Sequence, residues 1–186
     1  MNNDPSSQLP SGLPAPLDDG ACRHLLGALL PDVPLASTSE QFIKLRQLSG
    51  LTVIYVYPLT ARPGVALPSG WDEIPGARGC TPESCAFRDH HDEFRKLGAK
   101  IYGLSAQSTE YQREARGRLH LPFDLLSDGS FAFADALGLP TFTVASMRLL
   151  RRVTLVTRDG VIVRVFYPVF PPDKHPADVV SYLRGA

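Results

Sequence analysis

The run Gly-Cys-Thr-Pro-Glu-Ser-Cys-Ala-Phe-Arg-Asp, residues 79–89, is the most informative for the fold, because it predicts a helix with a thiol in its first turn. Pro82 suits the first turn of a helix, where its missing N–H costs nothing. The N–H groups and the dipole at a helix start favour an anion, so we expect Cys80 to ionise more easily than a free thiol. Since the thiolate is the reactive form of cysteine, the run predicts a nucleophile at Cys80.

A second thiol, Cys85, follows on the same predicted helix. Ideal helix geometry separates the Cα atoms of Cys80 and Cys85 by roughly 8.6 Å. A disulfide needs its two Cα atoms within about 7 Å. If these cysteines cross-link, the start of the helix must therefore unwind. A pair that bonds only after local unfolding suits a catalytic cycle better than a structural staple.

The segments around this run alternate between strand and helix patterns. Residues 51–57, LTVIYVY, form a continuous β-branched and aromatic run, which is typical of a strand buried on both faces. A loop rich in Gly and Pro follows over 59–79 and leads into the cysteine helix, expected from about 82 to 97. Further strands are expected at 100–104, 121–126, 151–157 and 161–167, and further helices at 21–30, 109–119, 128–138 and 176–183. The helix at 109–119 is expected to open with a capping box from Thr109. This order predicts an α/β fold with a mixed central sheet flanked by helices.

Composition is that of an ordinary globular protein of 186 residues. Residues 1–20 are rich in proline and lack apolar periodicity, so we expect a flexible tail there and a single domain over 21–186. The formal net charge is zero, which argues against binding to nucleic acid or to an anionic membrane. No stretch approaches the ~20 apolar residues of a membrane span. We expect a cytoplasmic protein, where unpaired thiols stay reduced.

Several motifs occur in one order along the chain. They are Tyr57-Pro58, GCTPESCAFRD at 79–89, KIYGLSA at 100–106, LPFDLLSD at 121–128 and RVTLVTRDG at 152–160. Over roughly residues 30–183 this ordered set resembles the peroxiredoxins of the bacterioferritin-comigratory-protein, or peroxiredoxin Q, subfamily. The resemblance implies a thioredoxin-like fold that reduces hydrogen peroxide and organic hydroperoxides with no metal or organic cofactor.

The resemblance also implies a role for particular residues. Cys80 matches the peroxidatic cysteine, which becomes a sulfenic acid, and Cys85 matches the resolving cysteine, which forms an intrachain disulfide. Arg152 matches the arginine that stabilises the thiolate and the peroxide oxygens. A thioredoxin-type dithiol protein would reduce the disulfide, and we expect a monomer or weak homodimer.

One part of the sequence departs from the family pattern. The family places a Thr or Ser hydroxyl three residues before the cysteine, where this chain has Ala77. In addition, an inserted loop separates Pro58 from the cysteine. We expect the hydroxyl of Thr60 to take that place, with Thr81 as the second choice.

Other interpretations use the same residues. Cys80, Cys85, His90 and His91 offer metal-ligand atoms, but four side chains on one helix point around its circumference and do not converge on one ion. Cys22 is expected to be unpaired and non-catalytic, with a role as an alternative resolving thiol as the minor possibility. The alternative functions are a peroxide redox sensor with poor turnover and a thiol–disulfide oxidoreductase. The latter generally carries Cys-x-x-Cys, which this chain lacks.

Overall fold

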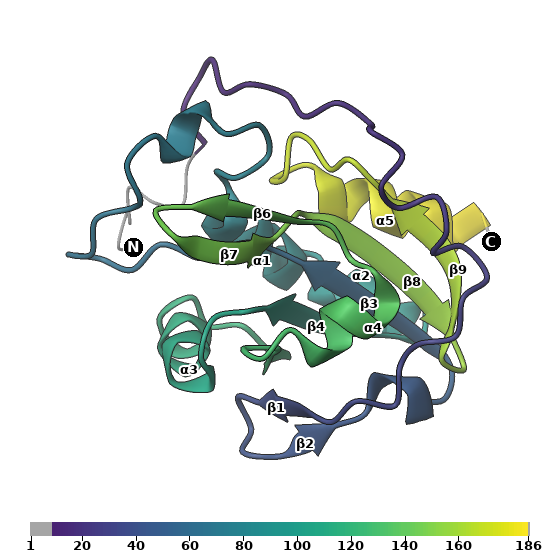
Figure 1. Cartoon of the computed structure of the whole chain (residues 1–186). Helices are drawn as coiled ribbons and strands as arrows, with labels where there is room; N and C mark the ends of the chain where they lie inside the picture. The colour runs from purple at the N-terminus through teal and green to yellow at the C-terminus, as the bar shows by residue number, and fades with distance from the viewer. Residues whose placement is uncertain (1–8, 186) are drawn as a thin grey trace.

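In the computed structural model, which describes residues 9–185, a seven-stranded mixed sheet forms the centre of the molecule (Figure 1). Its strand order is β2-β1-β5-β4-β3-β8-β9. The strands are β1 Leu35–Ser37, β2 Phe42–Ile43, β3 Leu51–Val56, β4 Ala99–Ser105, β5 Asp124–Ser127, β8 Val153–Arg158 and β9 Val161–Phe166. Strands β3, β4 and β5 run parallel, and the other neighbours pair antiparallel. A separate hairpin pairs β6 Thr141–Val144 with β7 Met147–Leu150.

Helices cover both faces of the sheet. The helices are α1 Cys80–Asp89, α2 His91–Lys96, α3 Thr109–Arg118, α4 Ala132–Leu137 and α5 His175–Gly185. Apolar side chains of α1, α2, α3 and α5 share one core cluster, whereas those of α4 belong to the cluster on the opposite face. The predicted fold class, a mixed sheet flanked by helices with an inserted loop before the cysteine helix, is therefore confirmed.

Strand β3 lies in the interior of the sheet, between β4 and β8. Its side chains alternate between the two clusters, with Val53 and Tyr55 on the α1 side and Ile54 and Val56 on the α4 side. All four side chains are fully buried, which confirms the predicted strand buried on both faces. Val56 at the end of β3 lies opposite Val153 at the start of β8. The segment that follows β3 and the segment that precedes β8 therefore meet at the same end of these two strands.

The expected helix from 82 to 97 is instead two helices, because α1 ends at Asp89 and α2 begins at His91. His90 joins them with a backbone outside the helical region, and its ring Nδ1 lies 2.9 Å from the Ala86 carbonyl oxygen. The predicted end of the helical segment near residue 97 is confirmed, since α2 ends at Lys96 and Gly98 has a φ of 72°.

The expected helix at 21–30 is wrong. This segment forms turns and lies along β9, where the Gly27 N–H donates to Ile162 and the Leu30 N–H to Gly160. Pairing with an open sheet edge thus outweighs the local helix pattern. The cap of α3 also differs by one residue, because the Ser108 hydroxyl, not that of Thr109, accepts from the Tyr111 N–H.

The inserted loop at 59–79 is ordered around a short 3-10 helix, Trp71–Glu73. Trp71 and Ala77 pack with Leu149 of β7 in a small third cluster, and the Trp71 ring lies 6.1 Å from the ring of Phe142 on β6. The β6–β7 hairpin, which sequence patterns missed, therefore supports the loop.

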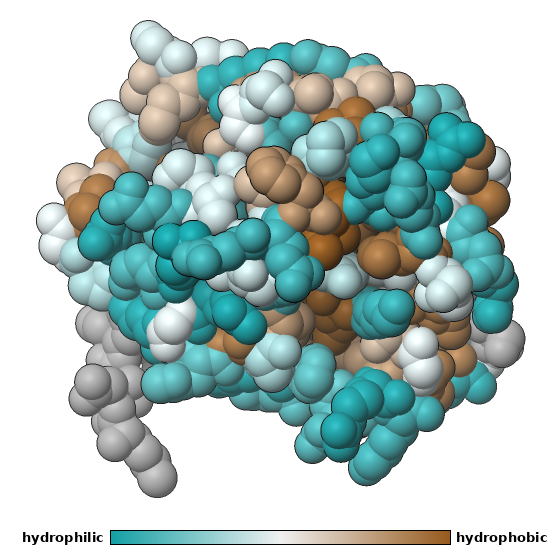
Figure 2. Space-filling model, turned by 90° about the horizontal axis from the view of Figure 1, so that it is seen from below, coloured by the Kyte–Doolittle hydropathy of each residue, from teal (hydrophilic) through white to brown (hydrophobic). Residues whose placement is uncertain are grey.

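The division into a tail at 1–20 and a domain at 21–186 stays a prediction, and residues 1–8 lie outside the described part. In Figure 1 the purple segment that begins at residue 9 runs along the outside of the fold. Figure 2 shows a face on which hydrophilic side chains surround a central hollow where apolar side chains are visible. Within residues 9–185, no helix combines the length and apolar character needed to cross a membrane.

Candidate active site

Cys80 is the first residue of α1 and is only 2% exposed. Gly79, just before it, has a φ of 109°, a conformation that favours glycine. A Cβ atom at Gly79 would lie 2.4 Å from Cγ of Pro172 and 2.8 Å from Cδ2 of Leu9. Glycine is therefore required both for the turn into α1 and for the close packing that buries the thiol.

Arg152 precedes β8 and is brought to Cys80 by the pairing of β3 with β8. Its Nη2 lies 3.2 Å from Sγ of Cys80 and donates to the carbonyl oxygens of Ala77 and Arg78, each at 3.3 Å. Its Nε donates to the carbonyl of Gly76 at 3.4 Å. One buried guanidinium thus contacts the thiol and holds the last turn of the loop before it.

Glu83, one helical turn after Cys80, is fully buried and forms an ion pair with Nη1 of Arg152. Its other oxygen, Oε1, has no hydrogen-bond partner among the described residues. Burial raises the pKa of Glu83 to about 7, against the opposing effect of Arg152. Sequence analysis did not select Glu83, since an acidic residue in a first helical turn is common on exposed helices.

The pKa of the Cys80 thiol is raised above its ordinary value, so the expectation of easier ionisation is wrong. The largest cause is burial, which disfavours the charged thiolate. The Arg152 guanidinium acts in the opposite direction, and the Glu83 carboxylate adds to the increase. Desolvation therefore outweighs the effect of the arginine.

Helix α1 is held against the sheet by aromatic packing and one buried hydrogen bond. The ring of Phe87 stacks on that of Tyr55, with centroids 4.4 Å apart, and the Tyr55 hydroxyl donates to Ser84 Oγ at 3.1 Å. These contacts involve the middle of the helix, which fixes the position of Cys80 at its start.

Thr60 is fully buried, and its hydroxyl donates to Oε1 of Gln107 at 3.0 Å. Among the described residues it makes no hydrogen bond to Cys80. The hydroxyl of Thr81, the second choice, is buried with no hydrogen-bond partner in the same part of the chain. Thr60 therefore stays a predicted site residue, and the structure shows its hydroxyl bonded to Gln107.

The other two cysteines differ in setting. Cys85 lies farther along α1 and is half-buried. Cys22 is 5% exposed in the core cluster on the opposite face, and burial raises its pKa to about 12. Among residues 9–185, no group of three or more His, Cys, Asp or Glu residues is arranged to hold a metal ion. His90 and His91 thus converge on no metal site in this part of the chain.

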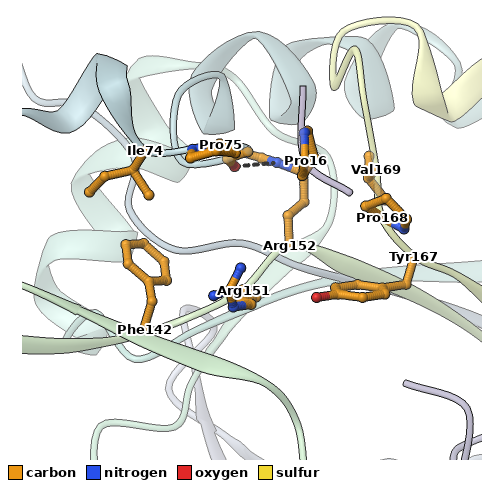
Figure 3. Close-up of a pocket in the computed structure, with 10 residues that line it drawn as sticks. Pro16, Ile74, Pro75, Phe142, Arg151, Arg152, Tyr167, Pro168 and Val169 are labelled. Carbon is orange, nitrogen blue, oxygen red and sulfur yellow. Dashed lines mark hydrogen bonds between the residues drawn. The ribbon is translucent and has the colours of Figure 1, made fainter. Parts of the chain in front are cut away.

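Two small pockets flank the site. One reaches Cys80 and is formed mainly by the inserted loop and the start of α1. The other lies beside Arg152, where Figure 3 shows Arg151 between Phe142 and Tyr167, and Arg152 reaching toward the loop. Arg151 and Arg152 therefore both line this second pocket, but only Arg152 contacts the thiol.

The structure thus places a buried thiol at the start of a helix, in contact with an arginine. Comparison with protein families finds that the family profile described as Redoxin matches residues 25–183. The chain belongs to the Redoxin family. The match includes Cys80, Cys85 and Arg152 and extends over most of the described fold.

Relatives within the Redoxin family are peroxiredoxins of the Q type. Peroxiredoxin Q of Oryza sativa subsp. japonica chloroplasts is 28% identical over 160 residues, which cover 86% of this chain and 66% of that protein. Peroxiredoxin Q of Sedum lineare chloroplasts is 29% identical over 160 residues, which cover 86% of this chain and 77% of that protein. This chain thus spans slightly less than two thirds of the length of the rice relative.

Solved structures agree with this placement. A Xanthomonas campestris peroxiredoxin Q is 27% identical, with a TM-score of 0.64 and coverage of 84% of this chain and 94% of that one. The peroxidoxin BcpB of Mycobacterium tuberculosis, 24% identical, shares the fold with a TM-score of 0.69 over 86% of this chain and 96% of that one. The resemblance to the peroxiredoxin Q group is confirmed.

Proposed function

We propose that this protein is a thiol peroxidase that reduces hydrogen peroxide and organic hydroperoxides through Cys80. The observation that carries the proposal is the contact of 3.2 Å between Arg152 Nη2 and Cys80 Sγ at the start of α1. The guanidinium favours the thiolate and supplies N–H donors toward a bound peroxide. A related Xanthomonas campestris protein is described by its alkyl peroxide reduction activity, which agrees with this chemistry.

In the first step, the Cys80 thiolate attacks one peroxide oxygen and the O–O bond breaks. The sulfur is oxidised to a sulfenic acid, and the departing oxygen leaves as water or alcohol after taking a proton. In the second step, the Cys85 thiolate attacks that sulfur, an S–S bond forms, the S–O bond breaks, and the hydroxyl leaves as water after taking a proton. A dithiol reductant then restores both thiols by exchange.

Peroxide consumption in the presence of excess reductant distinguishes a peroxidase from a redox sensor. With excess thioredoxin-type dithiol protein, we expect each chain to consume many equivalents of hydrogen peroxide. Peroxide loss is followed over time, and intact mass after one equivalent without reductant reports the disulfide. Consumption that stops at one equivalent despite reductant would instead support the redox-sensor function.

Our proposal places the protein in the cytoplasm as a monomer or weak homodimer.

The disulfide step predicts a change in α1. On an intact helix the two Cα atoms are roughly 8.6 Å apart, too far for a disulfide, so oxidation must unwind the helix start. Segments of low local stability move in this way during function. We expect faster amide hydrogen exchange in the oxidised protein within residues 79–88 and the 59–79 loop.

Strand β4 and helix α3 lie outside this region and serve as internal references, with unchanged exchange expected. Unchanged protection at residues 79–88, together with a Cys80–Cys85 bond seen by mass, would refute the unwinding step.

A further inference from the structure

The inserted loop forms one wall of the pocket that reaches the thiol. Leu67 and Trp71 of the loop line this pocket together with Leu59, Ala61, Arg78, Gly79, Cys80, Thr81 and Pro82. Most of these side chains are apolar. Because Cys80 is only 2% exposed, an incoming peroxide must pass this wall to meet the sulfur.

The wall is fixed in place from several sides. Trp71 is 3% exposed and packs against the β6–β7 hairpin through Phe142. Asp72, beside it, pairs with Arg78 at 3.0 Å. The carbonyls at the loop's end are held by Arg152. The loop therefore acts as part of the packed structure around the pocket.

The space beside the thiol is small. Its cavity volume is about 10 Å³. A cavity needs about 10–15 Å³ of such volume to hold one water molecule. Hydrogen peroxide is close to a water molecule in size. The pocket thus has room for a compact hydroperoxide and little room for a bulky substituent near the sulfur.

We propose that Leu67 and Trp71 are specificity-determining residues that select small hydroperoxides. This inference rests on the proposed function and names its substrate class. Hydrogen peroxide and short alkyl hydroperoxides reach Cys80, whereas a bulky aromatic hydroperoxide, such as cumene hydroperoxide, meets the two side chains. Leu67 and Trp71 act by excluding substrates that are too large, and the reaction at sulfur is unchanged.

The test measures the ratio of kcat/KM for cumene hydroperoxide to kcat/KM for hydrogen peroxide, and compares this ratio between the wild type and each variant. We expect Leu67→Ala to raise this ratio by about tenfold, since a few methylene groups in an apolar pocket discriminate to that extent. Val65→Ala is the matched control, because Val65 lies in the same loop but is 53% exposed and does not line the pocket. An unchanged ratio in Leu67→Ala would overturn the proposal.

A second measurement needs no peroxidase activity. In a Cys22→Ala/Cys85→Ser background, Cys80 is the only thiol, and its alkylation rates by iodoacetamide and by the bulkier N-phenylmaleimide are compared. We expect Leu67→Ala and Trp71→Leu to increase the rate of Cys80 alkylation by N-phenylmaleimide more than the rate of alkylation by iodoacetamide. Equal acceleration of both reagents contradicts size selection. If neither the wild type nor any variant turns over peroxide, the proposed function is refuted. The expected alkylation pattern would in that case still support size selection by Leu67 and Trp71.

Discussion

Cys80→Ser is expected to lower the rate of peroxide reduction by at least about a thousandfold. A serine hydroxyl is a poor nucleophile without a dedicated base, and losses of a catalytic nucleophile are of this size or larger. Peroxide consumption with excess dithiol reductant measures the effect. Cys22→Ala is the matched control, since Cys22 lies in the core on the other face of the sheet and should leave the rate intact. A wild-type rate in Cys80→Ser would show that another group is the nucleophile.

Cys85→Ser should leave the first oxidation intact and stop the second step. The product is then a sulfenic acid at Cys80, seen as a gain of one oxygen in the intact mass. Excess peroxide should oxidise it further, because the expected resolving thiol of Cys85 is absent. If Cys85→Ser still forms an intrachain disulfide, Cys22 is the resolving thiol, which is the minor possibility that the sequence left open.

Much of the fold could be predicted from sequence, because its longer elements carry strong local patterns. The runs behind β3 and β4 and the β8–β9 hairpin were found near their observed bounds. Strands β1 and β2 were missed because three and two residues are too few to show a period. The segment at 21–30 was misassigned because its hydrogen bonds go to β9, a partner far away in the chain.

The site was predicted in part. The resemblance pointed to Cys80 and Arg152, which the fold brings into contact. Glu83 was missed, since only tertiary packing shows that this first-turn carboxylate is fully buried against Arg152. The expected pKa of Cys80 was wrong for a related reason. A helix start is visible in sequence, whereas the burial that raises the pKa of Cys80 is not.

Arg152→Ala is expected to slow oxidation of Cys80 and to destabilise the fold. Loss of the guanidinium removes a positive charge 3.2 Å from Sγ, so the pKa of Cys80 should rise further. The alkylation rate of Cys80 against pH measures this shift. Glu83 would lose its ion-pair partner while fully buried, and breaking a buried pair from one side costs about 3–5 kcal/mol of unfolding free energy. Denaturant unfolding measures that loss.

A double variant separates the two effects. In Arg152→Ala/Glu83→Gln the buried carboxylate is neutral, so much of the lost stability should return. Oxidation should stay slow, because the guanidinium that contacts the thiol is absent. Arg151→Ala is the matched control, since Arg151 lines the neighbouring pocket without contacting Cys80, and it should change neither quantity strongly. If the double variant regains the wild-type rate of oxidation along with its stability, Arg152 acts only by holding the structure. If Arg151→Ala and Arg152→Ala slow oxidation equally, the contact between Arg152 and the thiol has no special role.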